Sequence, residues 1–267
     1  MMFKVKYIQE ICLEKTNLSM ANYNYKEGKQ RVLRILNNAV EVQKSKKVPK
    51  PDSSFSFNNG FNSWVTAVFV DIRDSKSLFS QNKKTTVARV IRAFTSEIIE
   101  ILKDDNNLRE IGIRGDCVYA IYTCSTENED YEILDKAIYV NTYIDMLNVL
   151  LSNKQMPNIK AGIGIATAMD LVVKAGRKGS DINNLVWIGD AVSFAAGLSS
   201  EANKHGKDKI LMTKQFYNGV IKQLKNNHPK KNIDNWFSFY KIPVIGECCG
   251  CNLVKTNFDN WIKNGMK

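Results

Sequence analysis

The chain has 267 residues, of which 44% are hydrophobic and 24% charged, and a formal net charge of +11. This composition is typical of a globular protein with a sizeable core, in one large domain or two small ones. No apolar run approaches the roughly 18 residues of a transmembrane helix. The N-terminal sequence MMFKVKYIQEICLEK also lacks the apolar core of a secretory signal. These features argue against a membrane-spanning or secreted protein.

The positive charge and the cysteines bear on partners and location. The charge is compatible with nucleic-acid binding, but it would also attract a nucleotide triphosphate. The lysines are spread along the chain rather than gathered in one recognition element, so we do not expect a nucleic-acid partner. Of the six cysteines, three form the cluster ECCGC at 247–251, with no second Cys/His pair nearby in the sequence. Reduced thiols of a cytoplasmic protein explain them better than a zinc site.

The N-terminal segment predicts a helix and a linker, and residues 1–25 are expected to be partly ordered at best. Residues 26–44 have the apolar spacing of a helix, whose buried face would consist of Val32, Ile35, Leu36, Ala39 and Val40. Residues 45–62 are rich in Pro, Ser, Asn and Gly, which is typical of a loop. We therefore predict a helix and linker over 1–60 and one main domain over 61–267.

The first motif of the main domain is a short apolar strand that ends in a carboxylate. Residues 65–70 are apolar, and Asp71 closes the run. A polar turn leads to a helix that begins near Leu78, for which Ser75 or Ser77 is the expected cap. A carboxylate at a strand end, beside a helix N-terminus, suits a metal ion that carries phosphate groups. An Asp that only caps the turn would give the same pattern.

A second carboxylate lies in a predicted hairpin. Residues 85–102 have the apolar stripe of a helix, and 110–122 then alternate around a Gly-Asp turn that places Asp116 at its tip. Two carboxylates at neighbouring strand ends can hold two Mg²⁺ or Mn²⁺ ions whose other ligands are triphosphate oxygens. A further helix is predicted over 130–153, and both helices are expected to cover one face of the sheet.

The remaining elements complete an α+β pattern. A strand near 159–168 precedes a basic, hairpin-like insert, the sequence LVWIGD at 185–190 and an Ala-rich helix from Ala191 to about Ala202. Strands at 210–212 and 236–242 flank a helix at 214–224, and the tail from Asn252 is uninformative. This order of elements predicts an α+β fold on one sheet.

Four of these segments, in this order, resemble the catalytic domain of class III nucleotidyl cyclases: FVDIRDS (69–75), RGDCVYAIY (114–122), AGIGIATA (161–168) and WIGDAVSFAAGLSSEAN (187–203). The resemblance covers about residues 60–220. Within the family the chain looks most like the pyrimidine cyclases of bacterial Pycsar anti-phage systems. The resemblance implies a ferredoxin-like βαββαβ core, an antiparallel sheet with helices on one face, and an additional N-terminal helix.

The resemblance also implies a reaction centre. Asp71 and Asp116 would bind two Mn²⁺ or Mg²⁺ ions per site, with the backbone carbonyl of Ile72 as a further ligand. The turn from Arg73 to Ser77, which includes Ser75, would hold the β- and γ-phosphates through backbone amides. The ribose 3′-hydroxyl would attack the α-phosphorus and pyrophosphate would leave. Metal ions can lower the pKa of the hydroxyl and neutralise charge on the leaving group.

The base-binding positions depart from those of purine cyclases. Where these enzymes place a Lys before the Gly-Asp turn the chain has Gly112, and where they place an Asp or Cys in the last motif it has Val186. A site that reads polar base edges needs polar partners, because unpaired buried groups are costly. Their absence argues against ATP or GTP and fits a smaller base. Trp64 or Phe69 could shape the smaller pocket, although ordinary core packing would also explain them.

The last helix departs from the family as well. The Asn that orients the ribose and the Arg that stabilises the transition state are replaced by Ser193 and Gly197. Basic residues elsewhere could take over this role, and the candidates are Arg114, Lys174, Arg177 and Lys178. A run of charges can equally be a solvated surface.

Together these features predict a pyrimidine nucleotide cyclase that converts UTP to cyclic UMP, or else CTP to cyclic CMP. In the family, the metal-binding aspartates and the base and transition-state groups come from different subunits, which implies a homodimer with composite sites. The product would be a second messenger, read by a separate effector protein in anti-phage defence. A purine cyclase with unusual base contacts would fit the same motifs, and so would a non-catalytic nucleotide-binding domain.

Overall fold

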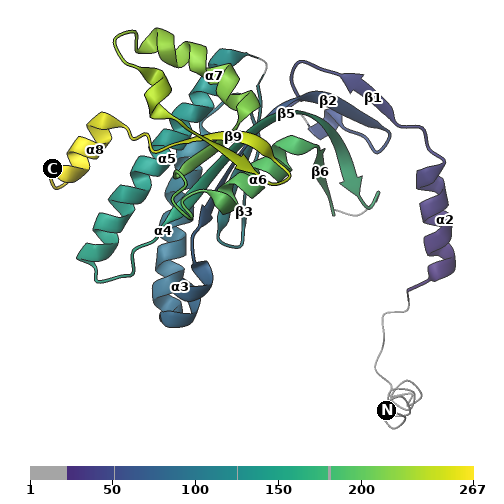
Figure 1. The fold of residues 1–267 in the computed structure, drawn as a ribbon. Coiled ribbons are helices and arrows are strands. Elements are labelled where there is room, and N and C mark those ends of the chain that lie inside the picture. The colour runs from purple at the N-terminus through teal and green to yellow at the C-terminus, as the bar shows by residue number, and fades with distance from the viewer. Residues whose placement is uncertain (1–22, 51, 125, 180–181) are drawn as a thin grey trace, which may run out of the picture. The chain divides into compact units, whose positions relative to one another are not determined.

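Figure 1 shows the fold of the protein as a computed structural model, which describes residues 23–50, 52–124, 126–179 and 182–267. The chain divides into two compact units, Met1–Val40 and Glu41–Lys267. Most of the segment 1–25, which the sequence predicts to be partly ordered, lies outside the described residues. The larger unit thus begins before the predicted domain start at residue 61.

The N-terminal unit contains helix α2 (Tyr25–Leu36). Asn24 caps its start, because the Asn24 side chain accepts a hydrogen bond from the amide of Glu27 at 3.2 Å. The prediction of one helix over 26–44 is wrong in its second half. The helix ends at an Asn-Asn pair, whose side chains compete with helical hydrogen bonds. Residues 41–44 instead form strand β1, which pairs with the larger sheet.

The larger unit is built on one mixed sheet, in which the strands follow the order β3-β4-β2-β5-β7-β9-β8, with β1 beside β2 and β6 beside β5. The strands are β1 (Glu41–Lys44), β2 (Asn59–Ile72), β3 (Leu108–Arg114), β4 (Cys117–Thr123), β5 (Ala161–Gly176), β6 (Asn183–Ile188), β7 (Ile210–Thr213), β8 (Ser238–Ile242) and β9 (Gly246–Cys251). Most neighbours are antiparallel, but β1 is parallel to β2 and β5 is parallel to β7. In this detail the sheet differs from the fully antiparallel one predicted.

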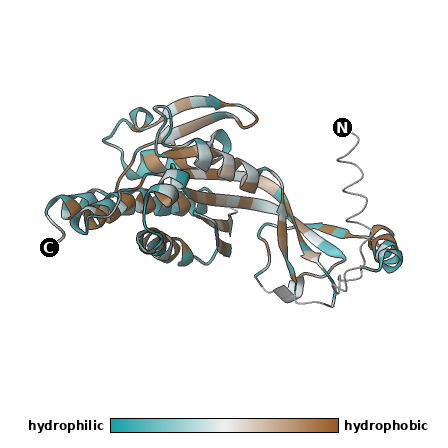
Figure 2. Ribbon diagram, turned by 90° about the horizontal axis from the view of Figure 1, so that it is seen from below, coloured by the Kyte–Doolittle hydropathy of each residue, from teal (hydrophilic) through white to brown (hydrophobic). Residues whose placement is uncertain are grey.

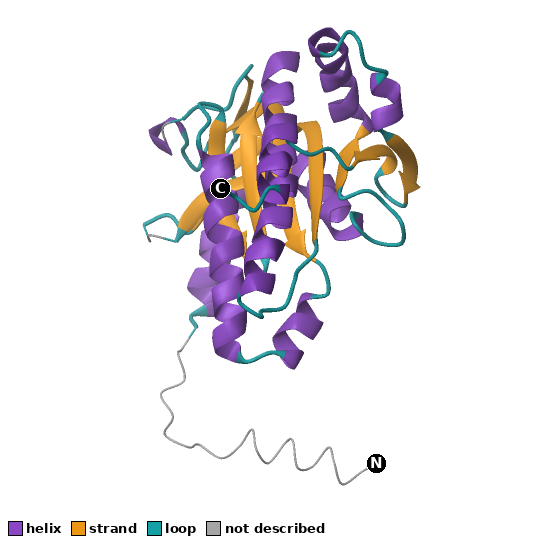
Figure 3. Cartoon of the chain, turned by 90° about the vertical axis from the view of Figure 1, so that its left-hand side faces the viewer, coloured by secondary structure: helices purple, strands orange, loops and turns teal. Residues whose placement is uncertain are grey.

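The helices of the larger unit are α3 (Ser75–Gln81), α4 (Lys84–Lys103), α5 (Glu127–Asn153), α6 (Asp190–Glu201), α7 (Lys214–Asn227) and α8 (Thr256–Lys263), with 3₁₀ turns at Asp52–Ser54 and Ile233–Trp236. Helices α4, α5 and α7 bury their apolar sides against one face of the sheet in the main core, and Figure 3 shows helices lying over the strands. Hydrophobic residues run along the central strands (Figure 2). The helices predicted over 85–102 and 130–153 are thereby confirmed, together with their shared face and the α+β fold.

Helix α6 lies on the opposite face of the sheet, which corrects the expectation that helices cover one face only. The reason is the pair of glycines in the AGIGIATA segment of β5. A Cβ added at Gly164 would lie 2.1 Å from the carbonyl oxygen of Ala195, and one added at Gly162 would lie 2.5 Å from that of Ser199. Only strand positions without side chains allow the α6 backbone to approach so closely.

The C-terminal part departs most from the predictions. The strand predicted at 236–242 begins only at Ser238, because a 3₁₀ turn precedes it. The ECCGC cluster forms most of strand β9, where Cys248, Cys249 and Cys251 are buried and free. In the tail, α8 is a short helix with an apolar side. Within the described ranges, no group of three or more His, Cys, Asp or Glu residues could hold a metal ion, and no helix is long and apolar enough to cross a membrane.

Asp130, in the first turns of α5, is a half-buried carboxylate and makes folding depend on pH. Its Oδ1 accepts a hydrogen bond from the Thr66 hydroxyl at 2.9 Å, and burial raises its pKa to about 6 from 3.8. Between these two values the folded chain holds a proton that the unfolded chain has lost. The free energy of unfolding therefore falls as the pH rises from about 4 to about 6, by up to about 3 kcal/mol.

We expect Asp130→Asn to remove this loss. The variant should be more stable than the wild type at pH 7.5, by up to about 3 kcal/mol, and equally stable near pH 4. Urea unfolding at both pH values measures the difference. Glu127→Gln, at an exposed position in the first turn of the same helix, is the matched control and should show no such pH dependence. An Asp130→Asn variant with unchanged stability at pH 7.5 would contradict the prediction.

Candidate active site

Asp71 and Asp116 meet at one edge of the sheet, as the sequence predicts. Asp71 lies at the end of β2 and pairs directly with Cys117, the first residue of β4. Asp116 immediately precedes Cys117 in the β3–β4 turn, which Gly115 closes with a φ of 66°. The charge of Asp116 acts on Asp71. The two carboxylates therefore share one site.

The electrostatics of Asp71 show opposing influences. Burial is the largest cause that raises the pKa of its carboxyl group, and the nearby charge of Asp116 adds to this rise. The charges of Arg73 and Lys204 act in the opposite direction. The pKa of Asp71 is nevertheless raised on balance, so additional positive charge beside this partly buried carboxylate would stabilise its ionised form.

Arg73 is the cation in direct contact with this site. Its Nη2 donates to Oδ2 of Asp71, forming a salt bridge, and its side chain is only 3% exposed. Its Nη1 donates to the carbonyl oxygen of Ser200 in α6 at 2.6 Å. The backbone amide of Arg73 donates to the carbonyl of Lys160 at 2.7 Å. Arg73 thus links the Asp71 end of β2 to helix α6.

The turn after Arg73 differs in detail from the prediction. Helix α3 starts at Ser75 rather than near Leu78, and its N-cap is Asp74, in the left-handed conformation and without a side-chain capping bond. Glycine adopts the left-handed conformation most easily, and Asp and Asn come next because their short polar side chains can form local hydrogen bonds. The amides of Arg73 and Ser77 donate to carbonyl groups of the fold. Of the turn from Arg73 to Ser77, the backbone amides that remain for the predicted binding of phosphates are therefore those of residues 74, 75 and 76.

The donor set at this edge fits a magnesium or manganese ion. It consists of the carboxylates of Asp71 and Asp116 and the backbone carbonyl of Ile72, which are all oxygen ligands. Mg²⁺ is typically held by one or two carboxylates together with waters and substrate phosphates rather than by a complete protein cage. The residues that the resemblance implies as ligands thus suit the chemistry of the ion.

Arg114 is on the same face of the sheet as Asp71. It pairs with Cys117, which in turn pairs with Asp71, so the three form a row across β3, β4 and β2. Directly opposed residues point to the same face, and two strand spacings separate the Cα atoms of Arg114 and Asp71 by about 10 Å. Among the predicted replacement cations, Arg114 is therefore placed near the aspartates within one chain.

Next to this row, a cluster of aromatic residues surrounds a glutamate. Phe69 stacks on Tyr119 with ring centroids 5.4 Å apart, within the range of offset aromatic stacks. The Tyr119 hydroxyl donates to Oε1 of Glu110 at 2.7 Å, and the Trp187 indole donates to Oε2 at 2.7 Å. A Cβ added at Gly112 would lie 2.7 Å from the Tyr119 hydroxyl. Tyr119 therefore fills the space beside the position where purine cyclases have a Lys.

Trp64 and Phe69 do not lie together. The register of β2 with β5 is continuous from Gly60 to Ile72, and residues an odd number apart on a strand point to opposite faces. Phe69 shares the face of Asp71, whereas Trp64, which is 38% exposed, lies on the other face. Phe69 therefore lies on the Asp71 side of the sheet, and the base-binding role of Trp64 stays a prediction.

Lys174 and Arg177 lie far from Asp71 along the sheet. Val173 pairs with Gly60 at the start of β2, whereas Asp71 lies near the end of this 14-residue strand, about 37 Å of extended chain away. Lys174 lines a cavity of about 280 Å³ together with Glu110 and Leu185. Its side chain therefore shares this cavity with Glu110, and Arg177 and Lys178 follow directly after β5.

Ser193 and Gly197 face a cavity of about 690 Å³ between α6 and the β8–β9 turn. The Ser193 hydroxyl donates to the carbonyl of Gly189 at 3.1 Å.

The motif Gly189-Asp190 itself has a structural cause, because the buried carboxylate of Asp170 accepts a hydrogen bond from the amide of Ala191 at 3.4 Å. A Cβ at Gly189 would lie 2.0 Å from that carboxylate oxygen. Asp170 thus caps α6 and requires the glycine.

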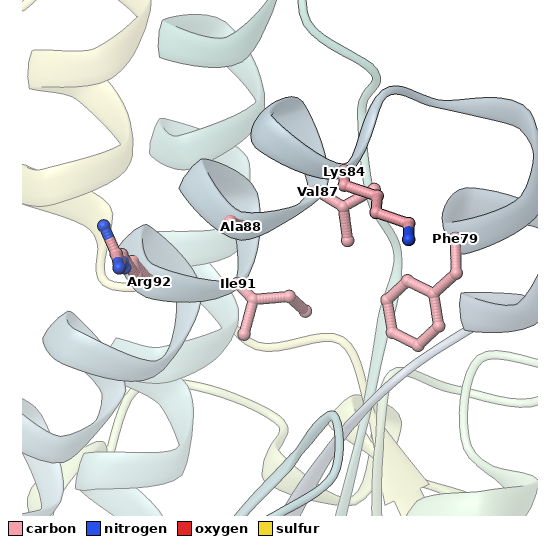
Figure 4. A pocket seen from close by; sticks show the side chains of 6 residues that line it. All are labelled: Phe79, Lys84, Val87, Ala88, Ile91 and Arg92. Atoms are coloured by element: carbon pink, nitrogen blue, oxygen red, sulfur yellow. The ribbon is translucent and has the colours of Figure 1, made fainter.

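A separate hollow of about 480 Å³ lies between α3 and α4 (Figure 4). Its lining is mostly apolar, with two cationic side chains, and consists of Phe79, Lys84, Val87, Ala88, Ile91 and Arg92. It contains no carboxylate, so it does not share the chemistry of the Asp71 site.

Comparisons with known proteins agree with this geometry. A sequence model described as the adenylate and guanylate cyclase catalytic domain matches residues 61–234. A protein named Uridylate cyclase from Treponema porcinum is 43% identical, over 98% of this chain and 88% of that protein. Another of that name, from Gulbenkiania mobilis, is 30% identical over 91% of this chain and 97% of that protein.

Solved structures show the same fold. The guanylyl cyclase Cya2 matches with a TM-score of 0.57 and 12% identity, over 72% of this chain and 93% of that one. The adenylyl cyclase CyaB from P. aeruginosa matches with a TM-score of 0.54 and 16% identity, over 70% of this chain and 93% of that one. The fold is thus that of a cyclase-type domain. The chain belongs to the adenylate and guanylate cyclase catalytic domain family, which confirms the resemblance carried by the four motifs.

Proposed function

We propose that the protein is a uridylate cyclase, which converts UTP to 3′,5′-cyclic UMP and pyrophosphate. The observation that carries the proposal is the meeting of Asp71 and Asp116 at neighbouring strand ends. The name Uridylate cyclase, borne by two relatives that align with most of the chain, supports the choice of substrate.

The chemistry of the site follows from its charges. Asp71, Asp116 and the Ile72 carbonyl would hold Mn²⁺ or Mg²⁺, two ions per site, which when bound acidify the 3′-hydroxyl and offset charge on the pyrophosphate. The amides at positions 74–76 bind the phosphates, and Arg114 contributes positive charge on the same face. These groups hold the α-phosphorus in line with the hydroxyl that attacks it.

The aromatic cluster supports a small base. A Lys at position 112 would collide with Tyr119, and both oxygens of Glu110 already accept hydrogen bonds from Tyr119 and Trp187. The surroundings of position 112 thus consist of aromatic rings and an already bonded glutamate rather than groups that read a purine edge. This arrangement favours UTP or CTP over ATP or GTP, because a larger base would need the space that Tyr119 fills.

The wider setting is also a proposal. We place the cyclase domain at 61–267, with strand β1 of the preceding segment added to its sheet. We place it in a cytoplasmic protein whose cyclic nucleotide is a second messenger in anti-phage defence, read by a separate effector. A second candidate function is that of a non-catalytic nucleotide-binding domain. Its support is the pair Ser193 and Gly197 at the positions where family members carry ribose-orienting and transition-state groups.

The test is to incubate the protein with each of the four nucleoside triphosphates and Mn²⁺ and to identify cyclic products by mass. We expect cyclic UMP from UTP. Cyclic CMP as the main product would move the substrate to CTP, and cyclic AMP alone would refute the pyrimidine assignment. No product with any triphosphate, with Mn²⁺ or Mg²⁺, would favour the non-catalytic domain.

We further propose a homodimer in which Arg177 and Lys174 of one copy complete the site formed by Asp71 and Asp116 of the other. The separation of these residues along the sheet supports an assignment across two copies. We expect Arg177→Ala and Asp71→Asn each to be inactive alone. Mixed and re-associated, they should regain about a quarter of wild-type activity, because half of the dimers would then hold one intact site. Full turnover by Arg177→Ala, or a fully active monomer, would contradict this arrangement.

A further inference from the structure

The contact between Arg73 and Asp71 places a cation of the chain on a carboxylate that also serves as a metal ligand in the proposed function. The Arg73 guanidinium bonds to Oδ2 of Asp71, and its Nη2 also lies 3.3 Å from the backbone oxygen of Asp71. Its Nη1 is held by the carbonyl of Ser200. The guanidinium is therefore fixed by β2 and α6 together.

The backbone of Arg73 is fixed, but its side chain is not fully satisfied in the position that the structure shows. The backbone is fixed, because the Arg73 amide donates to the carbonyl of Lys160 at 2.7 Å. The Nε–H group, by contrast, is buried and makes no hydrogen bond to any part of the chain that the structure describes. A buried donor without a partner is costly, so the observed position does not satisfy the whole guanidinium.

A divalent ion that approaches Oδ2 of Asp71 would repel the guanidinium bound there and compete with it for the same oxygen. We propose that the divalent ion binds Asp71 by displacing the Arg73 guanidinium, so that metal binding and the position of the Arg73 side chain are coupled. Arg73 is then a positioning residue of the proposed cyclase site, on whose metal ligand Asp71 this inference rests. It holds the aspartate until an ion replaces it.

The proposal predicts that removing the guanidinium strengthens metal binding. For Arg73→Gln we expect Mn²⁺ to bind about tenfold or more tightly, because a charge-assisted hydrogen bond no longer competes with the ion. Electron paramagnetic resonance of free Mn²⁺ measures the affinity without nucleotide. Lys204→Gln is the matched control, because Lys204 acts on Asp71 through its charge. Its effect should stay within about threefold.

Equal effects of the two substitutions would overturn the proposal, because the guanidinium and the ion would then share the carboxylate. Weaker Mn²⁺ binding by Arg73→Gln, or no Mn²⁺ binding by either form, would overturn it as well. If Arg73→Gln does not fold, a second measurement on the wild-type protein still tests the proposal. Titration with Mg²⁺ should average the Arg73 Nη resonances in ¹⁵N NMR, and unchanged resonances while the Asp71 amide shifts would refute displacement.

These measurements separate the proposal from the function on which it rests. They use the metal alone, without any triphosphate. A protein that shows the exchange but makes no cyclic UMP from UTP would refute the uridylate cyclase assignment and leave the role of Arg73 standing. A protein that makes cyclic UMP, yet shows equal effects of Arg73→Gln and Lys204→Gln, would refute only the exchange.

Discussion

Replacing Asp71 with Asn is expected to abolish formation of the cyclic nucleotide while the fold persists. The amide keeps the shape of the side chain but carries no charge, so it is a far weaker ligand for Mg²⁺ or Mn²⁺. Metal ions supply several kcal/mol of charge stabilisation in such reactions, so turnover of UTP should fall by about a thousandfold or more. Asp116→Asn should act in the same way, because both carboxylates belong to one site.

Product formation from UTP under saturating Mn²⁺ measures this loss. Asp104→Asn is the matched control, since Asp104 is an exposed residue at the end of α4, and it should retain wild-type turnover. Thermal unfolding of all three variants shows that the fold is intact. Turnover within tenfold of the wild type in both Asp71→Asn and Asp116→Asn would exclude these aspartates as the metal ligands.

The sequence locates the acidic site because that site depends on local patterns. A buried strand that ends in Asp71 and a hairpin with Gly115-Asp116 at its tip are each readable from alternation and turn residues. Their convergence follows from pairing of neighbouring strands. Helix α4 is predicted for a similar reason, because it has a long apolar stripe that packs on one face of the sheet.

Contacts between distant segments could not be predicted in this way. Glu110 and Trp187 are hydrogen-bonded across 77 positions of sequence, and no periodicity signals that β6 returns toward β3. The role of Arg73 is hidden for the same reason, since its partner Ser200 lies on α6. A clue to this helix was present in the alternating glycines of AGIGIATA. Small residues spaced by two on one face of a strand indicate close approach of another backbone.

Gly164→Ala is expected to destabilise the protein strongly, because it tests this close approach directly. The added Cβ would lie 2.1 Å from the carbonyl oxygen of Ala195 and 2.3 Å from the amide nitrogen of Ser199. Both atoms belong to the α6 backbone, so no side-chain rotation can relieve the overlap. Overpacking of this kind costs about 3 kcal/mol or more, which corresponds to a fall of roughly 10 °C in Tm for a domain of this size.

Thermal unfolding measures this fall in Tm. The control is Gly197→Ala, because Gly197 lies on α6, the helix that packs against Gly164 of β5. A Cβ at Gly197 would meet only the end of the Ile245 side chain at 3.0 Å, and alanine is favoured over glycine inside a helix by about 1 kcal/mol. The control should therefore keep or raise Tm. Because α6 also carries the Ser200 carbonyl that holds Arg73, Gly164→Ala should disturb the aspartate site as well as the fold. An unchanged Tm in Gly164→Ala would mean that α6 does not rest on β5 at this glycine.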